Sequence, residues 1–102
     1  MNKSILIAAL FSFIVGTAQA ATAGNEFEIE RADAFEQGVT TLEIAKEQLG
    51  TPFSVSTDAE GNQTIWWKYV KVNLFGKDIR KLAVVFDKDG KMLRIAHREA
   101  FK

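Results

Sequence analysis

Three segments in the second half of the chain alternate apolar and polar residues, and this pattern constrains the fold more than any other feature. They read TIWWKYVKVNL from residue 64, IRKLAVVFD from residue 79 and KMLRIAH from residue 91. Their β-branched and aromatic content is typical of strands, and the segments FGKD and KDG between them are typical of turns. The pattern predicts an antiparallel sheet, to which residues 53–57 (FSVST) add a short strand.

The alternation also assigns side chains to two faces, because successive residues of a strand point in opposite directions. The predicted buried face consists of Ile65, Trp67, Tyr69, Leu82, Val84, Phe86, Leu93 and Ile95, with His97 following the same alternation near the end of the last strand. The opposite face receives Trp66, Lys68, Val70, Val85, Arg94 and Ala96. We expect this second face to be open.

Residues 38–52 (GVTTLEIAKEQLGTP) predict an amphipathic helix. Its apolar residues recur at helical spacing, at Leu42, Ala45 and Leu49. Thr40 is the predicted N-cap, and Glu43 stands three residues later, where it would complete a capping box. Gly50 is suited to the turn after the last helical residue, and Pro52 blocks continuation.

Residues 29–37 predict a second, shorter helix that ends at Gly38. Two helices lying on the predicted buried face would cover its apolar residues at once. We therefore predict an α+β fold over residues 29–102, in which two N-terminal helices pack on one face of a three- to four-stranded antiparallel sheet as a two-layer sandwich.

The first twenty residues predict a secretory signal peptide. Lys3 precedes an apolar run over residues 5–15, and Ala18 and Ala20 supply the small residues at the −3 and −1 positions. Cleavage after Ala20 would release a soluble periplasmic chain without a transmembrane segment, beginning with a flexible tail at residues 21–28. The alternative is an uncleaved membrane anchor, for which the run is short.

Composition and charge exclude several classes of function. The chain has no cysteine, which excludes thiol catalysis, cysteine-bound zinc and a lipid anchor on cysteine, and His97 is the one histidine. A formal net charge of zero argues against nucleic-acid binding. Residues 21–63 carry nine acidic and two basic residues, whereas residues 64–102 carry ten basic and four acidic ones. This asymmetry is compatible with binding to a charged partner. The alternative is that two solvated faces of opposite charge keep the domain soluble.

Groups that could carry chemistry are sparse. Asp87-Lys88-Asp89-Gly90 begins like a calcium loop but lacks the third ligand before the glycine and the bidentate acid after it, so a hairpin turn is favoured. Two carboxylate pairs are predicted to be solvated surface: Asp33 with Glu36, and Asp58 with Glu60. His97 lacks a recognisable nucleophile motif around it and is expected to be a strand-end residue. We predict no catalytic residue, no metal and no cofactor.

Binding is a better prospect than catalysis, because one sheet face is left open. Trp66, Lys68, Val70 and Arg94 form the candidate interaction face. An aromatic side chain framed by lysine and arginine is typical of protein interfaces. The alternative is an ordinary half-polar sheet face with one large residue lying across it.

The order of these signals resembles the BamE (SmpA/OmlA) domain family of bacterial outer-membrane assembly factors. The matching residues are Gly38, Val39 and Thr40; Leu49, Gly50 and Pro52; Trp67 and Tyr69; and Leu82, Val84, Phe86 and Gly90. The resemblance covers roughly residues 35–95. It implies two helices on an antiparallel sheet and a non-enzymatic, periplasmic role in protein contact, accessory to the assembly of outer-membrane or envelope proteins.

Members of that assembly machine carry a cysteine directly after the signal peptide, where this chain has Ala20 and Ala21. We therefore expect a member without a lipid anchor. The expected fold also resembles one repeat of the beta-lactamase inhibitory proteins, which bind enzymes through an open sheet face. The sequence thus leaves two kinds of partner open: components of envelope assembly, or a soluble enzyme that the protein inhibits.

Overall fold

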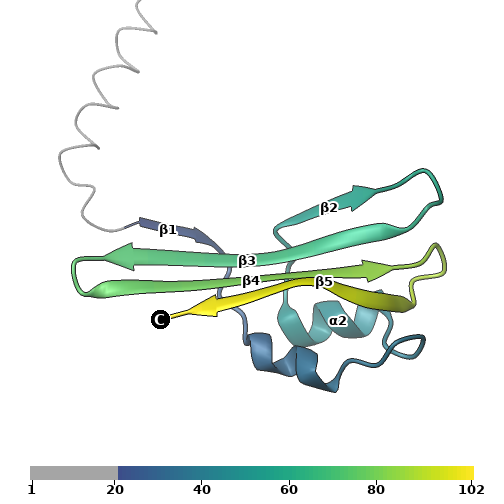
Figure 1. The fold of residues 1–102 in the computed structure, drawn as a ribbon, viewed down its shortest axis with the longest axis horizontal. Helices are drawn as coiled ribbons and strands as arrows, with labels where there is room; N and C mark the ends of the chain where they lie inside the picture. The colour runs from purple at the N-terminus through teal and green to yellow at the C-terminus, as the bar shows by residue number, and fades with distance from the viewer. Residues whose placement is uncertain (1–20) are drawn as a thin grey trace, which may run out of the picture.

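A computed structural model describes residues 21–102 of the chain. The predicted signal peptide, residues 1–20, lies outside the described residues. The described part begins with strand β1 (Ala21–Gly24), the 3-10 helix η1 (Ile29–Ala34) and the α-helix α2 (Leu42–Leu49) (Figure 1). Four strands follow: β2 (Ser54–Thr57), β3 (Gln63–Asn73), β4 (Gly76–Phe86) and β5 (Met92–Phe101).

These strands form one antiparallel sheet. Its order is β1-β3-β4-β5, and β2 also pairs with β3. β1 pairs with residues 69–72 of β3 and β2 with residues 63–66, so the two short strands share one edge of β3 and β5 forms the opposite edge of the sheet. β3 and β4 make a long hairpin whose register runs without a shift from the pair Gln63–Phe86 to the pair Asn73–Gly76.

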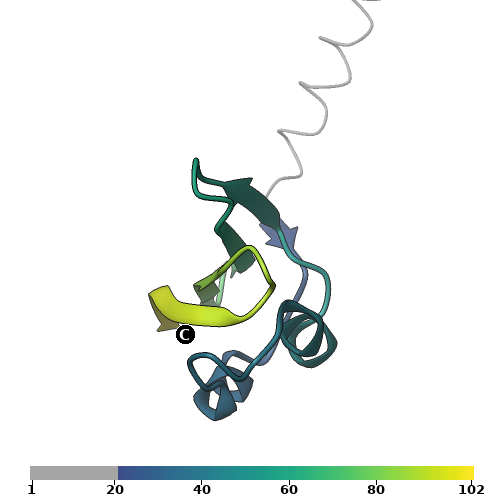
Figure 2. The ribbon, with the colours of Figure 1, turned by 90° about the vertical axis from the view of Figure 1, so that its right-hand side faces the viewer.

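The core lies between the sheet and the two short helices, which sit on the same side of the sheet (Figure 2). We call this side the inner face and the opposite side the outer face. In β3 the burial alternates as predicted from the sequence, with Ile65 and Trp67 buried and Trp66 and Lys68 only partly so. In β4, by contrast, every residue from 82 to 86 is buried, whichever face it lies on. The core cluster comprises Phe27, Ile29, Ala32, Ala45, Leu49, Ile65, Trp67, Tyr69, Leu82, Val84, Phe86 and Met92.

The predicted fold class is wrong, because the described chain is mostly β. The sheet has five strands, and α2, with eight residues, is the one α-helix among residues 21–102. The second predicted helix, over residues 29–37, is reduced to six residues of 3-10 helix. Its buried residues, Ile29 and Ala32, are three apart, a spacing at which a 3-10 helix aligns side chains on one side.

Residues 21–28 also differ from the predicted flexible tail. Their first four residues form β1, and Phe27 is buried in the core. Gly24 has a φ of 78°, and a Cβ added there would overlap the backbone carbonyl of Lys68. Only glycine therefore lets this segment approach β3 so closely. The segment ATAG has no apolar pattern, so its structure comes from pairing with the edge of β3.

The start of α2 lies one residue later than the sequence predicts. Thr41 is the N-cap, and its Oγ1 accepts a hydrogen bond from the backbone N–H of Ile44 at 3.2 Å. Thr40 is buried instead, and its Oγ1 accepts from the N–H of Glu36 at 2.8 Å. The predicted capping box between Thr40 and Glu43 is therefore wrong.

The end of α2 follows the prediction more closely. Gly50 is the C-cap with a φ of 87°, and its N–H donates to the carbonyl of Lys46. A positive φ of this size favours glycine. The carbonyl of Gly50 in turn accepts a hydrogen bond from the indole Nε1 of Trp67 at 2.9 Å, which ties the end of the helix to β3.

Strand β5 departs from the simple alternation at two places. Its register with β4 shifts between Ala83 and Val84 and again between Val85 and Phe86. Each shift leaves one extra residue in β5, as in a β-bulge. Met92 therefore takes the core position predicted for Leu93, whereas Ile95 packs against the core as predicted. His97 lies opposite Ala83, on the outer face, so its predicted inward position is wrong.

Candidate interaction face

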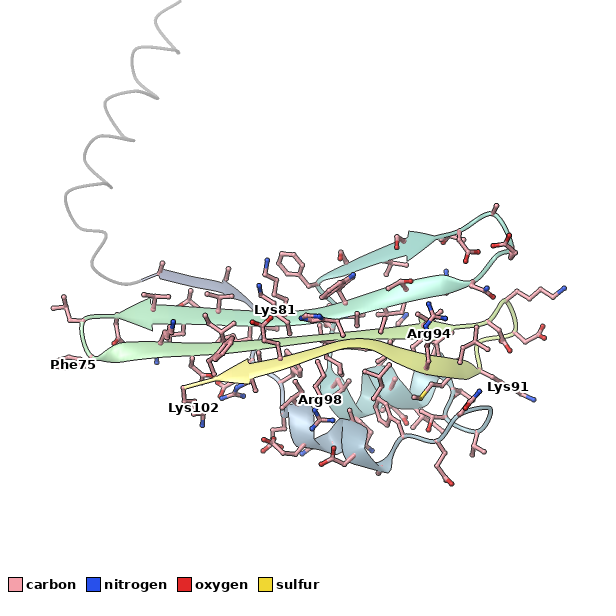
Figure 3. All side chains as sticks on the ribbon, in the orientation of Figure 1. Phe75, Lys81, Lys91, Arg94, Arg98 and Lys102 are labelled. Carbon is pink, nitrogen blue, oxygen red and sulfur yellow. The ribbon has the colours of Figure 1, made fainter. Side chains whose placement is uncertain are left out.

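The outer face is built from rows of residues that lie opposite one another across β3, β4 and β5. The arginine row is Thr64, Val85 and Arg94; the aromatic row is Trp66, Ala83 and His97; the lysine row is Lys68, Lys81 and Glu99; and the aliphatic row is Val70, Ile79 and Phe101. Arg94 and Lys81 mark two of these rows in Figure 3. Neighbouring rows are two residues apart along β3, a separation of about 6.6 Å.

In the aromatic row, two rings cover the alanine that lies between them. Trp66 and His97 belong to β3 and β5, which are about 9.6 Å apart because β4 lies between them. Their ring centroids are nevertheless only 5.5 Å apart, with 41° between the ring planes. The two rings therefore lean toward each other over Ala83, which is fully buried. The bulge after Ile95 creates this contact, since it delivers His97 to the outer face.

The lysine row places two cations directly opposite each other. Lys68 and Lys81 are paired in register, an arrangement that is destabilising between like charges. The ion pairs within residues 21–102 include neither of them. Lys68 Nζ lies 5.1 Å from the centroid of the Phe53 ring. Both lysines are half-buried, so they present their charge close to apolar surface.

The third member of the lysine row is an acid whose carboxylate is engaged elsewhere. Glu99 Oε1 lies 3.1 Å from Nε2 of His97 in the aromatic row. Glu99 and His97 therefore form a contact between the two rows. With the histidine neutral, the lysine row carries a formal net charge of one positive unit, from two lysines and one glutamate.

A hollow of about 390 Å³ lies where the aromatic and lysine rows meet. Its lining consists of Phe53, Ser54, Trp66, Lys68, Lys81, His97 and Glu99. Aromatic walls with cationic groups between them are suited to an anionic group that is attached to apolar surface. This hollow is the feature of the outer face with the most specific chemistry.

All four residues of the predicted interaction face lie on the outer face. Trp66, Lys68 and Val70 occupy three neighbouring rows, and Arg94 is exposed opposite the buried Val85. Sequence reasoning missed Lys81, although its position next to the inward Leu82 was readable from the alternation. It also missed His97 and Glu99 because the bulges in β5 leave no clear mark in the sequence.

A second hollow, of about 500 Å³, lies between the N-terminal segment and the ends of β4 and β5. Arg80, one of its two cationic residues, is already satisfied. The guanidinium binds both carboxylate oxygens of Asp78, at 3.0 and 2.7 Å, and the carbonyl of Phe27 at 2.7 Å. Glu26 lies 3.4 Å away. The hydrogen bond from Arg80 lowers the pKa of Asp78 below its ordinary value. This cluster fastens the N-terminal segment to the sheet.

Three of the other carboxylates singled out in the sequence have structural partners. Asp87 Oδ1 accepts from the N–H groups of Asp89 and Lys91, at 2.9 and 3.0 Å, which builds the predicted hairpin turn. Asp58 Oδ1 accepts from two backbone N–H groups in the same manner, and Asp33 pairs with Arg98 at 2.8 Å. Between residues 21 and 102, no three His, Asp or Glu side chains gather where they could hold a metal ion.

The β3–β4 turn is a second exposed apolar surface. Leu74 and Phe75 are 76% and 96% exposed, and Phe75 is labelled at the end of the hairpin in Figure 3. Asn73 Oδ1 accepts from the N–H of Phe75 at 2.8 Å and holds the turn. Because Phe75 lies outside the rows, it provides an internal comparison for Trp66 in binding experiments.

Comparison of the chain with protein-family models, curated proteins and solved structures gave no match. The residues described by the structure include no helix that is long and apolar enough to cross a membrane. The outer face, with its aromatic row and opposed lysines, is therefore the feature from which a function is inferred.

Proposed function

We propose that this chain is an exported, periplasmic protein-binding module that holds a protein partner against its outer face. The observation that carries the proposal is the opposed pair Lys68 and Lys81 beside the aromatic row. Two like charges facing each other cost stability, and neither lysine forms an ion pair within residues 21–102, since Glu99, which lies opposite Lys81, contacts His97 instead. A partner that supplies negative charge and covers the rings would offset this cost.

Residue types on the face agree with such a role. Tryptophan and arginine are enriched among the residues that dominate binding energy in protein interfaces, and Trp66 and Arg94 stand in neighbouring rows. Partly exposed rings, including Phe53, and aliphatic side chains would lose their contact with water on binding. Ordered strands hold these groups in place, which reduces the entropy lost when a partner binds.

The proposed partner is a component of envelope protein assembly. This choice follows the SmpA/OmlA-like order of motifs, from Gly38 and Thr40 to Phe86 and Gly90. The second candidate is a soluble enzyme that the protein inhibits. The lack of a cysteine for lipid attachment favours this candidate, because an inhibitor acts in solution and needs no anchor.

Site-specific photo-crosslinking in intact cells tests the proposal. A photoreactive amino acid replaces Val70 in the aliphatic row, and a matched control replaces Ile44, which is 45% exposed on α2. We expect one protein to be crosslinked from position 70 and not from position 44. Barrel-assembly components would support the first candidate, and a soluble enzyme the second. Equal crosslinking from both positions, or none from position 70, would contradict the proposal.

A further inference from the structure

The order of the rows on the outer face indicates which pattern of side chains a bound partner would present. The lysine row lies between the aromatic row and the aliphatic row, so a cationic strip separates two apolar strips. Along β3 these are the positions Trp66, Lys68 and Val70. A ligand that satisfies all three rows must therefore present an apolar group, an anionic group and a second apolar group in that order or its reverse.

The distance between rows selects the conformation of the ligand. Neighbouring rows are two residues apart in a strand, or about 6.6 Å. Side chains at positions i, i+2 and i+4 of an extended segment point to one side at the same interval. An extended segment running along the strands thus aligns its alternate side chains with successive rows.

The charge of the lysine row selects the anion. Lys68 and Lys81 stand with Glu99 in this row, giving one net positive charge when His97 is neutral. A single carboxylate balances this charge, whereas a doubly charged group would also face the carboxylate of Glu99. The hollow of about 390 Å³ at this point is lined by both lysines and by Trp66 and Phe53, which gives the carboxylate cationic contacts and its stem apolar ones.

From these observations we infer that the outer face binds an extended segment of its partner with the pattern apolar-x-acidic-x-apolar, the acidic side chain lying between Lys68 and Lys81. The inference rests on the proposed function and specifies the chemistry of its partner. The aromatic row takes one apolar side chain of the segment, and Val70, Ile79 and Phe101 take the other. Arg94 lies one row beyond the aromatic row and is available to the flanking residue.

The test uses the 15N-labelled mature chain, residues 21–102, and three blocked peptides. The first is acetyl-Ser-Phe-Ser-Glu-Ser-Leu-Ser-amide. In the second, Gln replaces Glu, and in the third, Glu is moved by one position to break the alternation. Titration followed by NMR should shift the indole N–H signal of Trp66 with the first peptide. Both altered peptides should bind more weakly, by up to about fivefold, since a partly exposed ion pair contributes up to about this factor.

Substitutions test whether the preference for the acidic peptide comes from the pair Lys68 and Lys81 or from the net charge of the protein. The double substitution Lys68→Gln and Lys81→Gln should abolish the preference for Glu over Gln, and it should not lower stability because it removes a like-charge pair. The control is Lys46→Gln with Lys88→Gln, two exposed lysines outside the outer face, which changes the net charge equally and should retain the preference. Added salt should weaken binding of the Glu peptide more than that of the Gln peptide.

Equal binding of the Glu and Gln peptides, no binding of any peptide, or shifts confined to residues outside the outer face would overturn the inference. The crosslinking experiment distinguishes a failure of this inference from a failure of the proposed function. Crosslinks from position 70 without any preference for the acidic peptide would leave the proposed function standing and remove only this inference. Absence of those crosslinks would remove both.

Discussion

Trp66 and Trp67 are neighbours in the sequence but should respond to truncation in opposite ways. Trp67 is 1% exposed and belongs to the core, whereas Trp66 is half-buried on the outer face. We predict that Trp67→Ala strongly destabilises the fold, and that Trp66→Ala leaves it nearly intact.

The magnitude follows from the buried area. A buried tryptophan removes on the order of 150–250 Å² from water, and about 25 cal/mol for each Å² gives roughly 4–6 kcal/mol for the whole side chain. Alanine keeps part of this contribution, so the expected loss is about 3–5 kcal/mol. The carbonyl of Gly50, which accepts the indole N–H, is on an exposed residue and can bind water instead. Loss of this hydrogen bond therefore adds little to the stability lost in Trp67→Ala.

For Trp66→Ala the expected loss is smaller than for Trp67→Ala, because part of the Trp66 ring stays in contact with water in the folded state. The assay is urea unfolding of residues 21–102 followed by far-UV circular dichroism, which does not depend on tryptophan fluorescence. A domain of this length has a total stability of about 4–12 kcal/mol, so Trp67→Ala should remove a large share of it, and Trp67→Phe provides an intermediate. The assignment of the two faces would be refuted if Trp66→Ala were as destabilising as Trp67→Ala.

Three further predictions concern the fold. Thr40→Val should destabilise by about 1–2 kcal/mol, because it leaves a backbone N–H without its acceptor. Thr41→Ala should cost about 1 kcal/mol as a lost N-cap, and Glu43→Ala should be nearly neutral in the same urea titration; a large effect of Glu43→Ala would restore the capping box. Deletion of Ala96, the extra residue of the second bulge along β5, should preserve the fold and the face of every later residue, as monitored by the NMR spectrum; an unfolded deletion variant would show that the bulge is required. Asp78 has a lowered pKa in the folded state, so its contribution to stability is present above its unfolded pKa, near 4, and is lost as the pH falls through the folded value. Asp78→Asn should therefore be less stable than the wild type at pH 7, and the difference should shrink in urea titrations below about pH 4; a difference independent of pH would contradict this account.

The inner and outer faces of β3 and β4 could be predicted from the sequence because these strands pair without a register shift. Period-two alternation then assigns each side chain correctly, including Trp66 outward and Trp67 inward. The same rule failed in β5, where two bulges each add a residue. Alternation that ignores these bulges assigns His97 to the inner face, whereas it lies opposite Ala83 on the outer face, and it gives Leu93 the core position that Met92 occupies.

The other errors arose where tertiary contacts decide the local structure. Thr40 and Thr41 both fit an N-cap by residue type. Their roles are set by contacts far along the chain, since the carbonyl of Thr40 accepts from the N–H of Met92 at 2.8 Å. The segment ATAG, residues 21–24, carries no strand pattern and becomes β1 because the edge of β3 has backbone groups to pair. Such long-range pairing leaves little trace in local sequence.

The residues of the candidate site also differ in whether the sequence predicts their positions. Its members on β3 followed from alternation, and Lys81 on β4 was equally accessible to that argument. The contact between Trp66 and His97 was not, because it depends on the bulge that brings His97 to the outer face. The hollow between the aromatic and lysine rows therefore emerged only from the structure.

The most direct test of the outer face as the binding surface is the affinity of the crosslinked partner, once purified, for two aromatic variants. Trp66→Ala removes the ring at the centre of the face, and Phe75→Ala removes an exposed ring at the β3–β4 turn. A central aromatic of this kind contributes about 2 kcal/mol or more to binding, so we predict at least about thirtyfold weaker binding for Trp66→Ala and a change below about twofold for Phe75→Ala. The reverse result, with Trp66→Ala unchanged and Phe75→Ala impaired, would move the binding surface to the hairpin turn and contradict the account.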